Sequence, residues 1–154
     1  MTSMHHPLDT GWTLRPVGDV DQVPETIRSA TIPATVPGCV HTDLLRAGLI
    51  PDPYLGTNER DLMWIGETNW EYRCRFKVSA EMLDRPRVQL LCEGLDTVAT
   101  VRLNGEVIEE AANMHHPHRF EVRDLLTPGE HELSVTFASP VEAAKAKDRK
   151  STRL

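Results

Sequence analysis

The sequence predicts an all-β fold, a jelly-roll β-sandwich with one short helix. Residues 70–78 alternate between apolar and polar side chains at every position, and this period of two is that of a half-buried β-strand. A similar alternation recurs over residues 88–92, 99–103 and 132–137. Asn104-Gly105 predicts a tight hairpin turn, because both residue types tolerate positive φ angles. Half-buried strands that recur in this way are typical of sandwiches and jelly rolls.

The N-terminal part of the chain is expected to supply two strands. Residues 11–17 place Trp12 and Leu14 on one face of the first strand. Residues 31–36 form a second extended stretch, which its prolines confine to a sheet edge because proline has no backbone N–H to donate. The polar residues 19–29 between them are predicted to form a loop.

The predicted helix covers residues 40–47. Its apolar residues Val40, Leu44 and Leu45 lie on one side at helical spacing, and a glycine follows as the C-terminal stop. The next segment, residues 50–62, is a long loop punctuated by Pro and Gly. A loop of this length in a compact domain is usually functional or bound to another domain.

The central strand at 70–78 has an inward and an outward face. The inward residues are expected to be Trp70, Tyr72, Cys74, Phe76 and Val78, and the outward ones Glu71, Arg73, Arg75 and Lys77. A turn-rich link over 81–86 precedes strands predicted at 88–92, 97–104, 106–108, 120–122 and 131–138. With the N-terminal pair this gives roughly seven or eight strands, the number usual for a jelly roll.

Composition excludes several classes of protein. The 154 residues carry a formal charge of -6, which argues against nucleic acid or an anionic membrane as partner. No apolar run is long enough to span a membrane, and residues 1–10 contain no secretory h-region and are expected to be disordered. The three cysteines, Cys39, Cys74 and Cys92, are an odd number with no metal-type spacing. Cys74 and Cys92 fall on the inward faces of predicted strands, so buried free thiols are expected, with a disulfide as the alternative. A cytoplasmic protein without a cofactor is therefore expected.

A series of motifs extends along most of the chain. They lie in residues 36–45, 48–54, 64–67, 69–73, 93–101, 103–105, 113–120 and 139–140. In this order they resemble the N-terminal domain of β-mannosidases of glycoside hydrolase family 2. The resemblance implies a galactose-binding-like jelly roll that precedes an immunoglobulin-like domain and a (β/α)8 barrel. In the family the barrel carries the two catalytic glutamates of a retaining mechanism, so no catalytic residue is expected here.

The resemblance also suggests a C-terminally truncated domain. The family reaches the sugar through a late Trp-Asp-Trp-Gly segment, and this sequence contains none. We expect the jelly-roll domain to occupy residues 11–140, followed by a tail at 141–154. Residues 148–154 correspond to the translation of a sequencing adapter, and a genuine basic terminus is the alternative.

Two residues are candidates for sugar binding. Trp64, just after the long loop, could stack on a sugar ring, or it could pack the loop onto the sandwich or the barrel. Asn113 could hydrogen-bond a sugar hydroxyl, or it could have a structural role in a turn. The pair Asn58-Glu59 matches the family's acid/base motif by chance, because it lies in a loop of the wrong domain.

Other polar residues have ordinary explanations. His115, His116 and His118 invite a metal site, but no carboxylate or cysteine completes one, so no metal is predicted. Arg73 is expected to form a solvated or interdomain ion pair, and Thr42 or Asp43 to cap the helix.

Three functional hypotheses follow. The chain is an inactive domain of an enzyme that releases terminal non-reducing β-D-mannose from a β-mannoside oligosaccharide, and it packs on immunoglobulin-like and barrel domains. Alternatively, it is a free-standing non-catalytic carbohydrate-binding module, or a non-functional gene fragment. If strands of the jelly roll are missing, the exposed sheet edge predicts dimerisation or aggregation.

Overall fold

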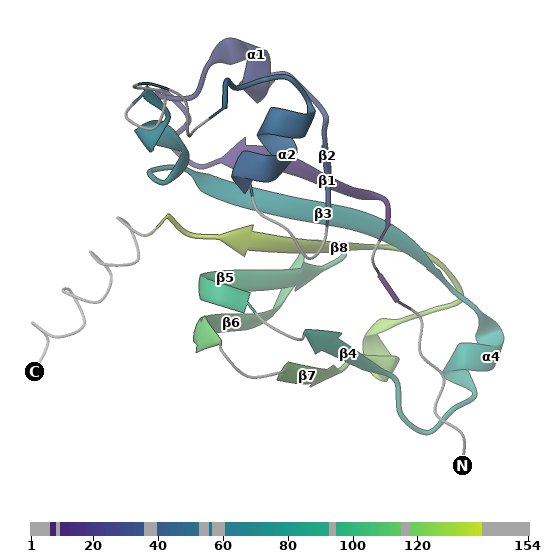
Figure 1. Ribbon diagram of the computed structural model, residues 1–154. Helices are drawn as coiled ribbons and strands as arrows, with labels where there is room; N and C mark the ends of the chain where they lie inside the picture. Colours follow the sequence, from purple (N-terminus) through teal and green to yellow (C-terminus); the bar gives the residue numbers. More distant parts are fainter. Residues whose placement is uncertain are drawn as a thin grey trace, which may run out of the picture.

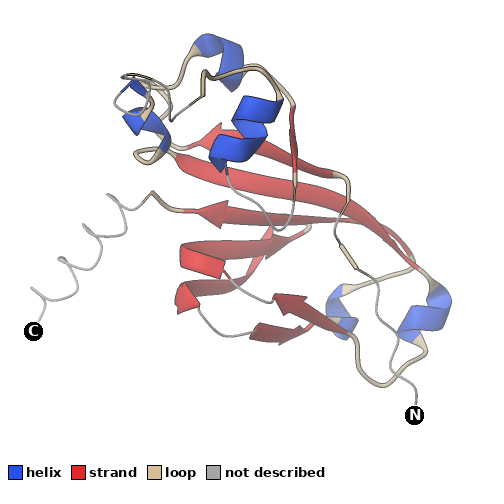
Figure 2. Cartoon of the chain, in the orientation of Figure 1, coloured by secondary structure: helices blue, strands red, loops and turns tan. Residues whose placement is uncertain are grey.

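The computed structural model describes residues 7–8, 10–35, 40–52, 56, 61–92, 95–114 and 118–139. Its strands are β1 (Trp12–Val17), β2 (Ile32–Ala34), β3 (Asn69–Val78), β4 (Gln89–Cys92), β5 (Leu95–Leu103), β6 (Glu106–Met114), β7 (His118–Glu121) and β8 (Gly129–Phe137). The helices are α1 (Glu25–Arg28), α2 (Val40–Arg46) and α4 (Ala80–Leu83), with the 3-10 turns η1 (Met63–Ile65) and η2 (Arg123–Leu125). Figure 2 shows that strands dominate the chain.

The described strands form two antiparallel sheets. The larger has the order β2-β1-β3-β8-β5-β6, and the smaller consists of β4 and β7 (Figure 1). β3 and β8 pair along their whole lengths, from Trp70 opposite Phe137 to Val78 opposite Gly129. This topology confirms the predicted all-β fold. Within the described ranges, no helix has the length and apolarity needed to cross a lipid bilayer.

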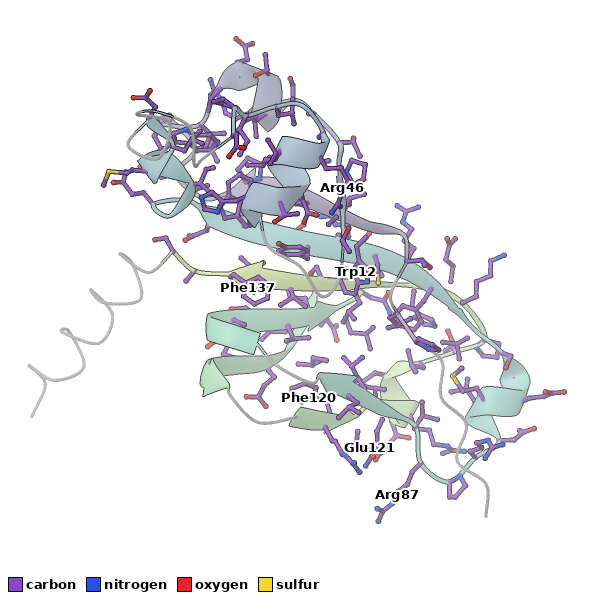
Figure 3. All side chains as sticks on the ribbon, in the orientation of Figure 1. Trp12, Arg46, Arg87, Phe120, Glu121 and Phe137 are labelled. Carbon is purple, nitrogen blue, oxygen red and sulfur yellow. The ribbon has the colours of Figure 1, made fainter. Side chains whose placement is uncertain are left out.

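The hydrophobic core lies on one face of the larger sheet. Leu14, Tyr72, Val101 and Val135 point into it from β1, β3, β5 and β8, each at most 8% exposed. Leu44 of α2 and Ile27 of α1 close the core over β1, β2 and β3, whereas β4 and β7 cover the part beneath β5 and β8 (Figure 1). Figure 3 shows Arg46, Arg87 and Glu121 projecting from the surface around this core. Each large buried side chain contributes roughly 1.5–3 kcal/mol.

Single-turn helices lie in two segments predicted to be loop or turn. α1 falls in the segment 19–29, follows Pro24 and buries Ile27 to 1% exposure. α4 begins before the 81–86 link, and the Ser79 hydroxyl caps it by accepting a hydrogen bond from Met82 N at 3.2 Å. The predicted helix at 40–47 is confirmed as α2.

The hairpin strands are longer than predicted on one side. β6 extends to Met114 rather than ending at residue 108. A register shift between Val101 and Arg102 breaks the regular pairing with β5, and the following Glu and Ala residues do not alternate. β6 therefore carried no period-two signal over most of its length. The predicted turn is confirmed, with φ of 53° at Asn104 and 86° at Gly105.

The alternation of β3 is confirmed except at Glu71. Trp70, Tyr72, Cys74 and Val78 are buried as predicted. Glu71 was expected to face water, yet it is only 8% exposed, because the side chains of two arginines cover its carboxylate on the outer face of the sheet. The outer face of this sheet is therefore polar without being fully solvated.

Candidate functional site

The two predicted sugar-binding residues lie toward the same end of the larger sheet. A row of directly paired residues marks this end: Trp70 on β3, Phe137 on β8, Ala99 on β5 and Ala111 on β6. η1, which contains Trp64, immediately precedes β3, and Asn113 follows Ala111 by two residues in β6. Two strands, β8 and β5, separate β3 from β6, a lateral distance of roughly 14 Å at normal strand spacing. The sheet thus brings both residues to one end without placing them side by side.

Trp64 packs against the core. Its ring centroid is 6.2 Å from that of Trp70, with the planes tilted by 43°. The backbone carbonyl of Trp64 accepts a hydrogen bond from the Thr68 hydroxyl at 2.7 Å, and Trp70 Nε1 donates to the carbonyl of Ile65 at 3.0 Å. These contacts match the packing alternative for Trp64. Its ring remains only half-buried, so stacking on a sugar stays a prediction.

Asn113 lies inside β6 and not at the start of a loop. It is the next-to-last residue of the strand, between the pairs Ala112–Val98 and Met114–Leu95. The position expected at the start of a loop is thus corrected to the end of a strand, and the alternative of a structural role in a turn stays a prediction. The side chain of Asn113 is outside the described part of the structure, so its role in sugar binding stays a prediction.

Other polar groups at this end of the sheet were not singled out in the sequence. Asn69 Oδ1 accepts a hydrogen bond from the backbone N of Ser139 at 2.7 Å, which fastens the chain after β8 to the start of β3. Gln22 Nε2 donates to the Thr68 hydroxyl at 3.1 Å. The residues that pair in this way are distant in sequence, so no local pattern indicated them. These bonds hold the chain on either side of β3 in place at this end of the sheet.

A network of charged residues occupies the outer face of β1, β3 and β8. Glu71 Oε1 lies 3.0 Å from Arg15 Nε and 2.8 Å from Arg73 Nη2. Glu132 lies 3.4 Å from Arg73 Nε and 3.7 Å from Arg75 Nε. The predicted ion pair of Arg73 thus forms within the domain. Each carboxylate faces two guanidinium groups, so this outer-face network links β1, β3 and β8 across the sheet.

Asp43 is the most deeply buried carboxylate among the described residues, at 1% exposure. Its Oδ1 accepts from the backbone N of Thr35 at 3.1 Å and from Arg46 Nη1 at 3.3 Å, while Oδ2 has no hydrogen-bond partner among the described residues. Burial raises the pKa of Asp43, opposed by the Thr35 bond and the Arg46 charge. The bond to Thr35 ties α2 to the residue that follows β2, and the capping role expected of Thr42 or Asp43 stays a prediction.

The cysteine and histidine predictions are only partly covered by the structure. Cys74 is a buried free thiol, as predicted. Burial and, to a smaller extent, the nearby Glu132 carboxylate raise its pKa to about 11. Cys39, His115, His116 and the Asn58-Glu59 pair lie outside the described residues, as do the side chains of Cys92 and His118. Within the described ranges, no group of His, Cys, Asp or Glu could hold a metal ion.

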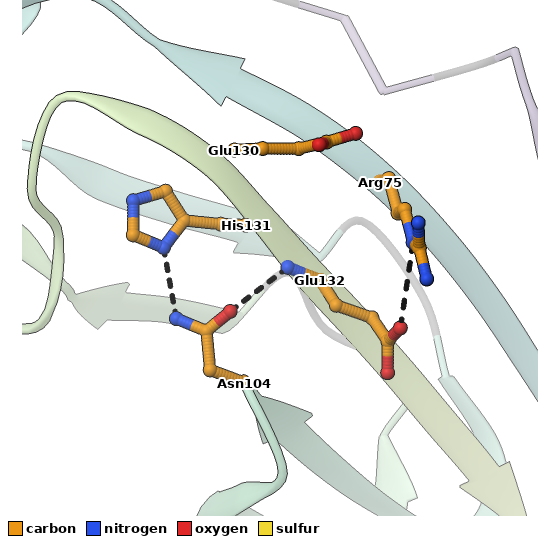
Figure 4. A pocket seen from close by; sticks show the side chains of 5 residues that line it. All are labelled: Arg75, Asn104, Glu130, His131 and Glu132. Atoms are coloured by element: carbon orange, nitrogen blue, oxygen red, sulfur yellow. Dashed lines mark hydrogen bonds and ion pairs between the residues drawn. The ribbon is translucent and has the colours of Figure 1, made fainter.

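Arginines hold the two buried carboxylates of the described residues. A retaining glycosidase needs two carboxyl groups about 5–5.5 Å apart across the bond it cleaves. The buried carboxylates of Asp43 and Glu71 belong to α2 and to the outer face of β3, and arginines engage both. A surface hollow lined by Arg75, Asn104 and His131 lies near the β5–β6 turn, at the other end of the sheet from Asn113 (Figure 4).

Comparison with known proteins shows that this chain is similar to one family of protein domains and to two β-mannosidases. Residues 12–154 match the family described as glycosyl hydrolase 2 galactose-binding domain-like. β-Mannosidase B of Thermothelomyces thermophilus is 41% identical over 134 residues, which cover 86% of this chain and 15% of that protein. The β-mannosidase of Bos taurus is 38% identical over 124 residues, which cover 80% of this chain and 14% of that protein.

A solved structure gives the same result. The crystal structure of β-D-mannosidase from Dictyoglomus thermophilum superposes with a TM-score of 0.80 at 39% identity, over 91% of this chain and 16% of that one. The chain therefore spans 14–16% of the length of these three relatives. The similarities confirm the resemblance indicated by the sequence motifs.

Proposed function

This chain belongs to the glycosyl hydrolase 2 galactose-binding domain-like family, and from that membership we propose that it serves a β-mannosidase as the N-terminal, sugar-binding-like domain. The enzyme would hydrolyse terminal non-reducing β-D-mannose residues of a β-mannoside oligosaccharide. Identities of 38–41% with two β-mannosidases over at least 80% of the chain carry the proposal. The reacting carboxylates would come from a barrel domain outside these 154 residues.

In this proposal the domain shapes one wall of the mannoside pocket. The end of the larger sheet that holds Trp64 and Asn113 would face the substrate, with the half-buried indole and the amide near the sugar. The sheet register places Ala99 and Ala111 in one row with Trp70 at this end. The polar outer face of the sheet and the helices that cover the core would hold this row rigid. The partners would be the immunoglobulin-like and barrel domains of the same enzyme. The buried free thiol of Cys74 supports a reducing, cytoplasmic location.

A domain graft tests this proposal. Residues 11–140 of this chain would replace the corresponding domain in the Dictyoglomus thermophilum β-D-mannosidase, and hydrolysis of 4-nitrophenyl β-D-mannoside would be measured. We expect the graft to hydrolyse the mannoside and the isolated 154-residue chain to show no turnover above a no-protein control. A folded graft that is inactive toward the mannoside, beside an active parent enzyme, contradicts the proposal.

Calorimetric titration separates this role from that of a free-standing carbohydrate-binding module. A domain that forms only one wall of a pocket should give a flat titration of the isolated chain with millimolar mannose or mannobiose. Saturable binding by the isolated chain would favour the free-standing module instead. The half-buried state of Trp64 supports the first outcome, since a stacking platform needs an exposed ring face.

A further inference from the structure

His131 occupies a buried position between two loops. It lies in β8, is 7% exposed, and its ring centroid is 5.9 Å from that of Phe76 on β3. Its Nδ1 is 2.8 Å from Asn104 Nδ2 in the β5–β6 turn (Figure 4). Its Nε2 is 2.7 Å from the carbonyl oxygen and 3.3 Å from the backbone N of Thr127, in the loop before β8. One imidazole therefore joins the β5–β6 turn to the loop that starts β8.

The backbone determines which way the Asn104 amide points. Glu132 N donates to Asn104 Oδ1 at 2.9 Å (Figure 4). Asn104 N in turn donates to the carbonyl of Glu132 at 2.8 Å. If the amide were reversed, its NH₂ group would face the Glu132 N–H, and two donors would meet. The NH₂ group of Asn104 must therefore point at His131, whose Nδ1 must accept.

The shorter contact of Nε2 decides the form of the ring. A carbonyl oxygen at 2.7 Å only accepts, so Nε2 must carry the hydrogen, and the Thr127 N–H at 3.3 Å then makes no bond with it. A neutral imidazole with its hydrogen on Nε2 donates to Thr127 O and accepts from Asn104 at Nδ1. An imidazolium carries hydrogens on both nitrogens, so its Nδ1–H would face the Asn104 NH₂ group. The bond to Asn104 would then be lost, or Asn104 would have to turn and give up its bond with Glu132 N.

We propose that His131 is a proton-operated latch, which fastens the β5–β6 turn to β8 while neutral and releases it when protonated. The charged groups lining the hollow around it are Arg75 of β3 and Glu130 and Glu132 of β8. Phe76 packs on the ring without charge. Asn104 supplies the decisive contact, because it presents only N–H groups to Nδ1.

The latch can be tested on the 154-residue chain by NMR between pH 8 and pH 5. Ring ¹⁵N shifts at pH 8 should show His131 with its hydrogen on Nε2. On protonation, the amide protection factor of Glu132 should fall roughly two- to tenfold, the factor for loss of one hydrogen bond. The amide of Val135, in the middle of β8, should keep its protection and serves as the internal reference.

An Asn104→Asp variant should reverse this response. Aspartate tolerates the left-handed backbone of this position, at φ 53°. Its carboxylate can accept from Glu132 N and also from a protonated Nδ1, so mild acid should now strengthen the latch and raise Glu132 protection. His41→Gln, which removes an exposed histidine on α2, is the matched control and should respond like the wild type.

Two results would overturn the proposal. One is a neutral ring with its hydrogen on Nδ1, which can be read on the wild type without any substitution. The other is the same acid response of Glu132 protection in the wild type and in Asn104→Asp. Neither result requires a variant without the His131 ring, so poor folding of such a variant does not affect the test.

Discussion

Arg15 and Glu71 stand directly opposite each other on β1 and β3, and Arg15 Nε lies 3.0 Å from Glu71 Oε1. The Arg73 guanidinium contacts the same carboxylate oxygen at 2.8 Å from two residues farther along β3. The Glu71 side chain is 11% exposed, whereas those of Arg15 and Arg73 are 53% and 37% exposed. Glu71 is thus the buried centre of a network whose cations remain partly hydrated.

Glu71→Gln should destabilise the domain, because two guanidinium groups would lose the charge between them. A fully buried pair costs about 3–5 kcal/mol to break, and the partial exposure of both arginines reduces the expected loss to about 1–2 kcal/mol. Urea unfolding at pH 7 measures it. Glu130→Gln, on the same outer face but exposed, is the control and should change stability by less than about 0.5 kcal/mol. Equal effects of the two substitutions would contradict the buried role of Glu71.

The burial of Glu71 could not be predicted from the sequence. The alternation of residues 70–78 correctly predicted β3 and its inward face, because periodicity depends only on neighbouring residues. It could not show that Arg15, from a strand 56 residues away, would cover the carboxylate. The Asp43–Thr35 and His131–Asn104 contacts could not be predicted either, because each joins residues that meet only when the chain folds.

The candidate site, like β3, could be predicted only in part from the sequence. Motifs indicated Trp64 and Asn113, and the strand registers place both at one end of the sheet. The strand assignment of Asn113 was missed, because Ala111 and Ala112 give β6 no alternation to read. Asn69 and Ser139 meet only after the chain has folded, so neither carried a local signal.

Asp43→Asn and Asp43→Ala should have opposite consequences. The asparagine keeps an oxygen for Thr35 N and removes a buried charge, so its stability at pH 7 should equal or exceed that of the wild type. The alanine leaves Thr35 N without its acceptor and should cost about 1–3 kcal/mol.

The pH dependence adds a second readout at Asp43. Because its pKa is raised on folding, the folded state binds more protons above pH 3.8, and stability falls as pH rises through that window. The advantage of Asp43→Asn should therefore shrink as the pH is lowered toward 3.8. Thermal unfolding of both proteins between pH 4 and pH 7 measures this difference. The assignment would be contradicted if Asp43→Asn were less stable than the wild type at pH 7 and more stable than the wild type in acid.

Cys74 should limit stability at alkaline pH. Its pKa rises from 9.0 to about 11, so the unfolded thiol ionises first, and stability falls as pH rises from 9 toward 11. Two pKa units correspond to roughly 2.7 kcal/mol at the end of that window. Cys74→Ala loses packing at every pH, but its unfolding free energy should fall less steeply between pH 9 and pH 11. Parallel curves for the two proteins would show that the pKa of the thiol is the same in the folded and unfolded states.

Trp64→Ala should separate packing from sugar stacking. Loss of the contact with Trp70 should lower stability by about 2–4 kcal/mol, since Trp64 is only half-buried. Trp64→Phe should recover much of that loss. If Trp64 also contacts the sugar, its loss should raise KM for the mannoside in the grafted mannosidase, even in the folded Phe variant. An unchanged KM in the Phe variant would leave Trp64 with a packing role alone.

The two-stranded sheet predicts self-association. β4 and β7 each have one edge that no other described strand pairs, and Leu91 on β4 is 40% exposed. Unpaired edges with apolar side chains template strand pairing between molecules, and an outward lysine opposes it by charge repulsion and hydration. Size-exclusion chromatography with light scattering should therefore show dimers or larger species for the wild type and a larger monomer fraction for Leu91→Lys. Leu45→Lys, a similarly exposed leucine on α2, is the matched control and should leave the distribution unchanged. A monomeric wild type at high micromolar concentration would show that these edges are protected.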